Sequence, residues 1–245
     1  MRIHHFTVAG RAGSTIAIMF GVGTVAVLAA GMGVAGMGAA EAEPVAVLGG
    51  SSGIVLGDTT ACSLTAIGYD AAGRLVGLTA GHCAAAGTPV SAERARDIGT
   101  IGTVDFSDGG RGLDYAVIAF DSAKVAPVRT VGETTIAGFG PAPGPGATVC
   151  ASGRSSGFDC GVVWGTQGDR ILSQSCSIPG DSGGPVTMGD QLVGMNQGRI
   201  NPFGVAVPCV AAAFPIHSPE YFRSIDQILR AIDAAGGVGA GFRPA

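Results

Sequence analysis

The chain has 245 residues, a formal net charge of −4, 43 glycines and only 6% aromatic residues. Its length is enough for one large domain or two small packed ones, with an ample core. An acidic balance without a basic cluster argues against nucleic acid as a partner.

The first 42 residues are typical of an export signal. Arg2 and Arg11 precede an apolar run over 16–40, and small residues surround Glu41. A charged start, an apolar run and an A-x-A-like site predict a signal peptide over 1–42. The run is also long enough to span a bilayer as an uncleaved anchor. Either way we expect the remainder to be secreted or in the cell envelope, with membrane contact only if the segment stays uncleaved.

Short strand-like runs between turn signals fill most of the remaining chain. They predict an all-β protein with barrels or sandwiches, since no βαβ alternation is present. The Pro/Gly run 141–146 cannot lie inside a central strand and separates 43–140 from 141–217. The expected strands are 62–69, 74–80, 99–106, 113–120, 130–138, 147–152, 160–165, 170–175, 185–188, 191–196 and 205–210, after an extended arm over 45–57.

One helix is predicted over 218–235. Ser218 suits an N-cap, Pro219 suits the first helical position, and Glu220 would favour the positive end of the helix dipole. Apolar residues then recur at helical spacing up to Ile232, which predicts a structural helix packed on the last barrel. We expect 236–245 to be a flexible tail.

Six cysteines follow the signal segment. An even number in an exported chain indicates disulfides, although six cysteines allow fifteen pairings. The simplest pairing joins neighbours, as Cys62–Cys83, Cys150–Cys160 and Cys176–Cys209. No C-x-x-C spacing is present and one spare histidine, His217, remains for a surface role, so neither a metal site nor a cofactor is expected.

Ser182 lies in Gly180-Asp181-Ser182-Gly183-Gly184, a stretch that can approach another molecule closely. The backbone N–H groups of Gly180 and Ser182 could form an oxyanion hole beside the Ser182 hydroxyl. A serine nucleophile needs a histidine base and an orienting carboxylate. An ordinary Gly/Ser turn has the same composition, so the remainder of the chain must supply these partners.

His82 and Asp114 are the candidates for those partners. His82 follows a strand-like run and precedes Cys83, whose disulfide would hold the loop. Asp114 lies at the mouth of the apolar strand 113–120, where a partly desolvated carboxylate needs a partner such as an imidazole N–H. A structural histidine and a strand-capping aspartate are the alternatives for each residue alone.

Together these motifs resemble the chymotrypsin-fold serine peptidases, above all the secreted bacterial streptogrisin and α-lytic type. The resemblance rests on 79–83, Asp114-Tyr115 and 176–185, in the order His82, Asp114, Ser182. It implies two perpendicular six-stranded antiparallel β-barrels, with the arm and first barrel over 43–140 and the second over 141–217. It also implies the neighbouring disulfide pairing and protein or peptide substrates, and we expect a monomer.

Two departures from the family pattern concern the substrate side of this site. Gln197 stands where the family has serine, which could alter the cleft. Asp181 needs a cationic partner, for which Arg154 is the candidate. The resemblance implies substrate contacts at Gln174, Gln197, Gly198 and Ala212. The pocket segments around these residues carry no carboxylate, which predicts small or apolar side chains at P1, the residue before the scissile bond.

Three functions are compatible with these motifs. The first is an exported serine endopeptidase that forms an acyl-enzyme. The second is a weakly active or inactive binding protein with the peptidase fold. The third is an esterase, but its triad order and the helix expected after the nucleophile do not fit this chain.

Overall fold

A computed structural model describes residues 43–201, 204–209 and 216–245. The segment from Ala42 to Ala245 forms one compact unit. The predicted signal segment 1–42 lies outside the described residues. Within the described ranges no helix is both long and apolar enough to cross a membrane.

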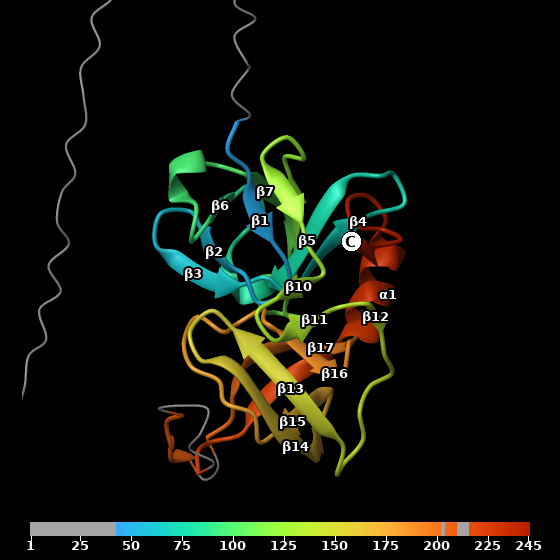
Figure 1. The fold of residues 1–245 in the computed structure, drawn as a ribbon. Coiled ribbons are helices and arrows are strands. Elements are labelled where there is room, and N and C mark those ends of the chain that lie inside the picture. The colour runs from blue at the N-terminus through green and yellow to red at the C-terminus, as the bar shows by residue number, and fades with distance from the viewer. Residues whose placement is uncertain (1–42, 202–203, 210–215) are drawn as a thin grey trace, which may run out of the picture. The chain divides into compact units, whose positions relative to one another are not determined.

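The first half of the unit is an eight-stranded sheet, in the upper part of Figure 1. No ladder joins its two edge strands β19 and β3, so it curves without closing, although six strands were expected. Its neighbours follow the order β19-β4-β5-β8-β7-β6-β2-β3. The strands are β2 (Gly53–Leu56), β3 (Thr60–Ser63), β4 (Ala66–Tyr69), β5 (Leu75–Ala80), β6 (Pro89–Ala92), β7 (Gly102–Ser107), β8 (Tyr115–Phe120) and β19 (Arg243–Pro244).

The second half is a closed barrel of six strands, since β18 pairs with both β15 and β17. The barrel follows the order β17-β16-β13-β14-β15-β18 and lies in the lower part of Figure 1. Its strands are β13 (Thr148–Gly153), β14 (Gly157–Gln167), β15 (Arg170–Ser173), β16 (Pro185–Met188), β17 (Gln191–Arg199) and β18 (Glu220–Ser224). The all-β fold class predicted from the sequence is confirmed.

Shorter elements accompany the two sheets. β1 (Ala46–Leu48) pairs with β9 (Val125–Pro127), β10 (Thr130–Val131) pairs with β11 (Thr134–Thr135), and β12 (Gly138–Phe139) pairs with β17. Two 3₁₀ helices lie at Gly81–Cys83 (η1) and Arg96–Ile98 (η2). The Pro/Gly run 141–146 contains no strand and leads into β13, as predicted. No strand lies in the described part of the predicted run 205–210.

The predicted helix is shorter than expected. Helix α1 spans Ile225–Ala235, and Glu220–Ser224 belongs to β18. The prediction of a helix start at Ser218 is therefore wrong, as is the end of the second barrel at 217. Ile225, Ile228 and Ile232 of α1 are buried in the same apolar cluster as the core of the first sheet. The helix thus packs against both halves, not against the last barrel alone.

The residues after α1 are ordered, contrary to the predicted flexible tail. β19 pairs with β4, and Phe242 is buried. The Gly239 N–H donates to Asp70 Oδ2 over 3.1 Å. These contacts attach the chain end to the first sheet.

Candidate active site

The candidate base His82 is held by covalent and hydrogen bonds on both sides. It lies in η1, directly after the fully buried strand β5. Cys83 forms a disulfide with Cys62 on β3. The Ser107 hydroxyl donates to the Gly81 carbonyl over 2.8 Å. The loop is therefore fixed where its imidazole must keep one orientation.

Asp114 faces His82 with both carboxylate oxygens. Oδ2 lies 2.8 Å from His82 Nδ1, and Oδ1 accepts the His82 backbone N–H over 2.8 Å. Asp114 has φ 60°, a left-handed conformation that is rare outside glycine and recurs at functional sites. Its own N–H donates to Asp108 Oδ2 over 2.7 Å, which helps to hold this conformation.

The pair shifts the pKa of each partner. The hydrogen bond to Asp114 raises the pKa of His82 despite partial burial of the ring. Burial by itself would raise the pKa of Asp114, but the hydrogen bonds from His82 outweigh it and hold that pKa below its usual value. The arrangement therefore keeps Asp114 ionised and stabilises a positive charge on His82.

The loop that carries Ser182 is bound to the first sheet. The Ser182 carbonyl accepts from the Ser63 N–H over 2.8 Å, and the Gly183 carbonyl accepts from the Thr65 hydroxyl over 2.5 Å. Gly183 has φ 82°, and a Cβ there would lie 2.8 Å from the backbone nitrogen of Ala80. Because Ala80 is two residues before His82, only glycine allows the serine loop to pack this close to the histidine loop.

The backbone N–H groups of Gly180 and Ser182 meet one requirement of the predicted oxyanion hole, which is that they are available to a substrate. Among the described residues, neither N–H donates a hydrogen bond within the protein. Within the same ranges the Ser182 hydroxyl and His82 form no direct hydrogen bond, although their loops are packed together. Hydrogen bonds between nucleophile and base are often long without substrate and shorten when it binds.

Comparisons with known proteins agree with this geometry, although no family model matches the chain. The uncharacterized protein Rv1815 of Mycobacterium tuberculosis is 30% identical over 218 residues, which cover 80% of this chain and 91% of the relative. Streptogrisin-C of Streptomyces griseus is 33% identical over 135 residues, covering 49% of this chain and 28% of that protein.

A solved structure of chymotrypsin from Cellulomonas bogoriensis has a TM-score of 0.59 and 26% identity, covering 82% of this chain and 99% of that chain. The chain belongs to the chymotrypsin-fold serine peptidases of the bacterial, streptogrisin-like type. The Nocardiopsis protease NAPase shares the fold at a TM-score of 0.61 and 24% identity, covering 76% of this chain and 96% of that chain.

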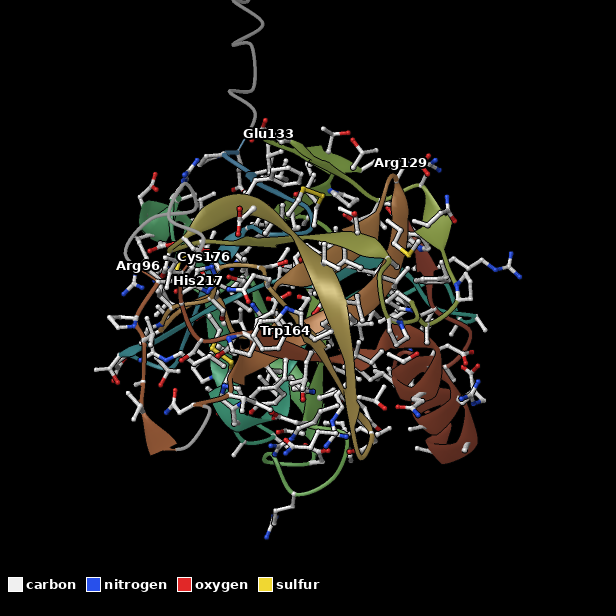
Figure 2. The ribbon with its side chains drawn as sticks, turned by 90° about the horizontal axis from the view of Figure 1, so that it is seen from below. Arg96, Arg129, Glu133, Trp164, Cys176 and His217 are labelled. Carbon is white, nitrogen blue, oxygen red and sulfur yellow. A yellow bond between two sulfur atoms is a disulfide. The ribbon has the colours of Figure 1, made fainter. Side chains whose placement is uncertain are left out.

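The disulfides of the chain join Cys62–Cys83, Cys150–Cys160 and Cys176–Cys209. The predicted pairing is confirmed, and no cysteine is free in the described ranges. No metal-binding group of acidic, histidine or cysteine side chains is found there either. His217 is buried, contrary to the surface role that we expected. Figure 2 labels it near Cys176, and its carbonyl accepts from Gln174 Nε2 over 3.0 Å.

Arg154 forms no ion pair or hydrogen bond with Asp181 in the described ranges, so the prediction that it is the direct partner of Asp181 is wrong. The Asp181 carboxylate instead accepts three backbone N–H groups, from Ser155, Ser156 and Ile178, at 2.9–3.0 Å. Arg154 forms an ion pair with Glu93. Both residues line a hollow of about 670 Å³ that none of the three candidate catalytic residues borders.

Gln197, which stands where the family has serine, contacts the backbone of Leu113 and Asp114. It is 4% exposed and lies at a bulge in β17, where the register with β18 shifts between Asn196 and Gly198. Its Nε2 donates to the Leu113 carbonyl over 2.6 Å and to the Asp114 carbonyl over 3.0 Å. The second barrel thus binds the backbone of the orienting aspartate through this side chain.

Two of the remaining predicted substrate residues, Gly198 and Gln174, lie next to strand positions that pair with Glu220. Gly198 is paired with Tyr221, Gln174 follows β15, and Ala212 lies outside the described residues. Glu220 is fully buried and accepts from the Ser173 hydroxyl over 2.7 Å. The premise that no carboxylate stands near the pocket segments therefore fails. The signal that could have revealed Glu220 is the strand pairing of 220–224, which the helix-start pattern concealed.

Proposed function

We propose that this chain is an exported serine endopeptidase with the catalytic triad His82, Asp114 and Ser182. The observation that carries the proposal is the two-oxygen contact of Asp114 with His82, next to a serine loop bound to the same sheet. The family supports a serine hydrolase, and the three disulfides are typical of proteins that mature in an oxidising compartment.

The mechanism follows from the proton positions that the contacts favour. Because Asp114 accepts at Nδ1, the neutral imidazole carries its proton there and leaves Nε2 free as a base. His82 then takes the Ser182 hydroxyl proton while Oγ bonds to the peptide carbonyl carbon. The free N–H groups of Gly180 and Ser182 would donate to the oxyanion.

The bond to the leaving amine breaks when His82 returns the proton to the amine nitrogen. This leaves an acyl group on Ser182. His82 takes a proton from water as its oxygen bonds to the acyl carbon, and returns that proton to Ser182 Oγ as the bond between Oγ and the acyl carbon breaks, which releases the carboxylic acid. Asp114 remains ionised throughout, consistent with its lowered pKa.

A Ser182→Ala change tests the assignment. We expect kcat for casein or a chromogenic peptide to fall by about 10⁶, because the nucleophile is lost. Ser156→Ala is the matched control, since only the Ser156 backbone contacts the site. Equal cleavage of casein by the Ser182→Ala and unchanged proteins would refute the triad.

A weakly active binding protein is the second candidate. The missing direct hydrogen bond between Ser182 and His82, in the described part of the chain, favours it. A fluorophosphonate probe separates the two functions, because an active serine is labelled and an inactive one is not. Labelling lost in Ser182→Ala and kept in Ser156→Ala would support the peptidase.

The sequence predicts small or apolar P1 side chains from a pocket without a carboxylate. Glu220 removes that premise, and its surroundings lead to a different P1 class.

A further inference from the structure

Glu220 is a carboxyl group enclosed by three strands of the second barrel. It begins β18, where it pairs with Ser173 of β15 on one side and Arg199 of β17 on the other. Its exposed fraction is 0%. A glutamate is rarely so deeply buried without a partner that compensates for the loss of water.

Only one of its two oxygens is satisfied. Oε1 accepts from the Ser173 hydroxyl over 2.7 Å, and the Ser175 hydroxyl also donates to the carboxyl group. Oε2 is buried with no hydrogen-bond partner among the described residues. A buried acceptor without a donor is costly, so an unfilled one indicates a missing ligand.

The place of Glu220 relative to Ser182 limits what this ligand can be. Ser173 and Ser175 run directly into Cys176, which begins the loop carrying Ser182. The charge of Asp181, the neighbour of Ser182, contributes to the raised pKa of Glu220. The carboxyl group is therefore close to the segment that leads into the Ser182 loop.

We propose that Glu220 is a specificity residue that receives a positively charged P1 side chain, lysine or arginine, of the peptide substrate. The inference rests on the proposed peptidase function. Ammonium and guanidinium groups carry several donors and can reach a buried oxygen on an apolar stem. The Ser173 and Ser175 hydroxyls would support the ionised carboxylate once the cation has entered.

The protonation of Glu220 agrees with such a site. Burial raises its pKa to about 8, so near neutral pH the empty group is largely uncharged. An incoming cation favours the ionised form and lowers this pKa again. The hydrogen-bonding groups around the cation and the ionised carboxylate then offset the loss of water that a buried ion pair suffers.

Arg199 is the internal cation that could take the place of a substrate. It stands opposite Glu220 in the β17–β18 register. The two form no ion pair in the described ranges, which include both residues. Arg199 is thus not the partner of Oε2 in the described structure.

The kinetic test compares Glu220→Gln with the unchanged chain on p-nitroanilide peptides that differ only at P1. The unchanged chain should have a higher kcat/KM for lysine or arginine than for phenylalanine or alanine. Glu220→Gln should lower kcat/KM for the basic substrates by about 100-fold or more and leave the apolar ones within a few fold. Glu133→Gln is the matched control, since Glu133 is exposed at the top of Figure 2.

A binding test separates failure of this inference from failure of the peptidase assignment. Benzamidine, an aryl cation, and benzamide, its neutral analogue, are titrated into Ser182→Ala protein by calorimetry. Benzamidine should bind at least about 10-fold more tightly than benzamide, and Glu220→Gln should abolish the difference. This result can hold even if the chain cleaves nothing.

Three outcomes would overturn the proposal. The first is a preference for apolar P1 residues that Glu220→Gln does not change. The second is equal binding of benzamidine and benzamide. The third is benzamidine binding that appears only after Arg199→Ala, which would make Arg199 the resident partner of Glu220. If fluorophosphonate labels Ser182 in such a protein, the peptidase assignment stands and the P1 inference alone fails.

Discussion

Asp114 and Glu220 are both buried carboxyl groups, yet their surroundings move their pKa values in opposite directions. Asp114, before β8 of the first sheet, receives the backbone N–H and the imidazole of His82. Glu220, on β18 of the second barrel, receives two serine hydroxyls and no cation in the described ranges. Burial raises the pKa at both groups but is complete at Glu220, where the charge of nearby Asp181 raises it further. At Asp114 the contacts with His82 outweigh burial.

The two carboxyl groups also differ in whether their hydrogen-bond partners are complete without a substrate. The Asp114 segment is complete without a substrate, since its carboxylate, its N–H and its carbonyl all have partners. The Glu220 carboxyl group is incomplete, since Oε2 has none among the described residues. The first group is arranged to keep its charge, and the second to gain charge when a cation arrives.

Among changes to these two carboxyl groups, Asp114→Asn should lower activity the most. An asparagine keeps the shape but removes the charge and favours the wrong imidazole tautomer. By analogy with other triads, kcat should fall by about 10⁴. Asp190→Asn, at an exposed turn, is the matched control. A loss below about 10-fold in a chromogenic peptide assay would show that Asp114 does not orient His82.

Glu220 should also make the protein less stable as pH rises. Its pKa is about 8 in the fold against an ordinary 4.5, so the folded chain binds more protons between these values. The contribution of Glu220 to the free energy of unfolding is therefore fully present below about pH 4.5 and is lost, by a few kcal/mol, as the pH rises towards 8. Urea unfolding at several pH values measures this slope.

Glu220→Gln should remove the Glu220 part of that slope, because an amide does not titrate, and leave the smaller part due to His82, whose pKa is also raised. The exposed change Glu133→Gln should leave it intact. An unchanged slope in Glu220→Gln would mean that another group titrates in this range.

The candidate catalytic residues could be proposed from the sequence because each lies in a short motif. The sequence around Ser182 carries the glycines that its loop requires, and His82 lies beside Cys83. The disulfide pairing was predictable because joining the six cysteines in chain order, each with its next neighbour, is the simplest arrangement. None of these inferences needed knowledge of contacts between distant segments.

Glu220 was misplaced because its strand depends on distant partners. Ser218-Pro219-Glu220 is a good local pattern for a helix start. Pairing of 220–224 with both β15 and β17 outweighs that pattern and delays α1 until Ile225. Burial of Phe242 likewise depends on packing against the first sheet, which the glycine-rich tail sequence does not reveal.

A change at Gln197 loosens the backbone that carries Asp114 without altering the Asp114 carboxylate itself. Gln197→Met keeps the volume but removes the donor to the Leu113 and Asp114 carbonyls. The orienting carboxylate should then be held less firmly, and kcat should fall by about 10- to 100-fold. Gln191→Met, on the same strand, is the control.

The pH profile separates a positioning role of Gln197 from a structural one. Activity requires neutral His82, whose pKa is raised by Asp114. A looser contact lowers that pKa, so the acidic limb of kcat/KM should move to lower pH in Gln197→Met. Lower thermal stability with an unmoved acidic limb would assign Gln197 a structural role alone.

Asp70 is a third buried carboxylate and lies away from the candidate active site. Its replacement should change stability only slightly, which makes it the smallest expected effect. Its side chain accepts from Arg74 Nε over 2.7 Å and from the N–H groups of Ala72, Arg74 and Gly239. Burial would raise the pKa of Asp70, but these hydrogen bonds outweigh it and lower that pKa. Its contribution to stability is therefore present above about pH 4 and is lost as the pH falls, opposite to Glu220.

Asp70→Asn should cost about 1 kcal/mol at neutral pH, because an amide cannot accept at both positions. The loss should be smaller at acidic pH, where the unchanged Asp70 is itself protonated. Since Gly239 loses its acceptor, its amide should also exchange hydrogen faster. The exposed change Asp97→Asn is the control, and equal exchange at Gly239 in both variants would show that Asp70 does not hold the chain end.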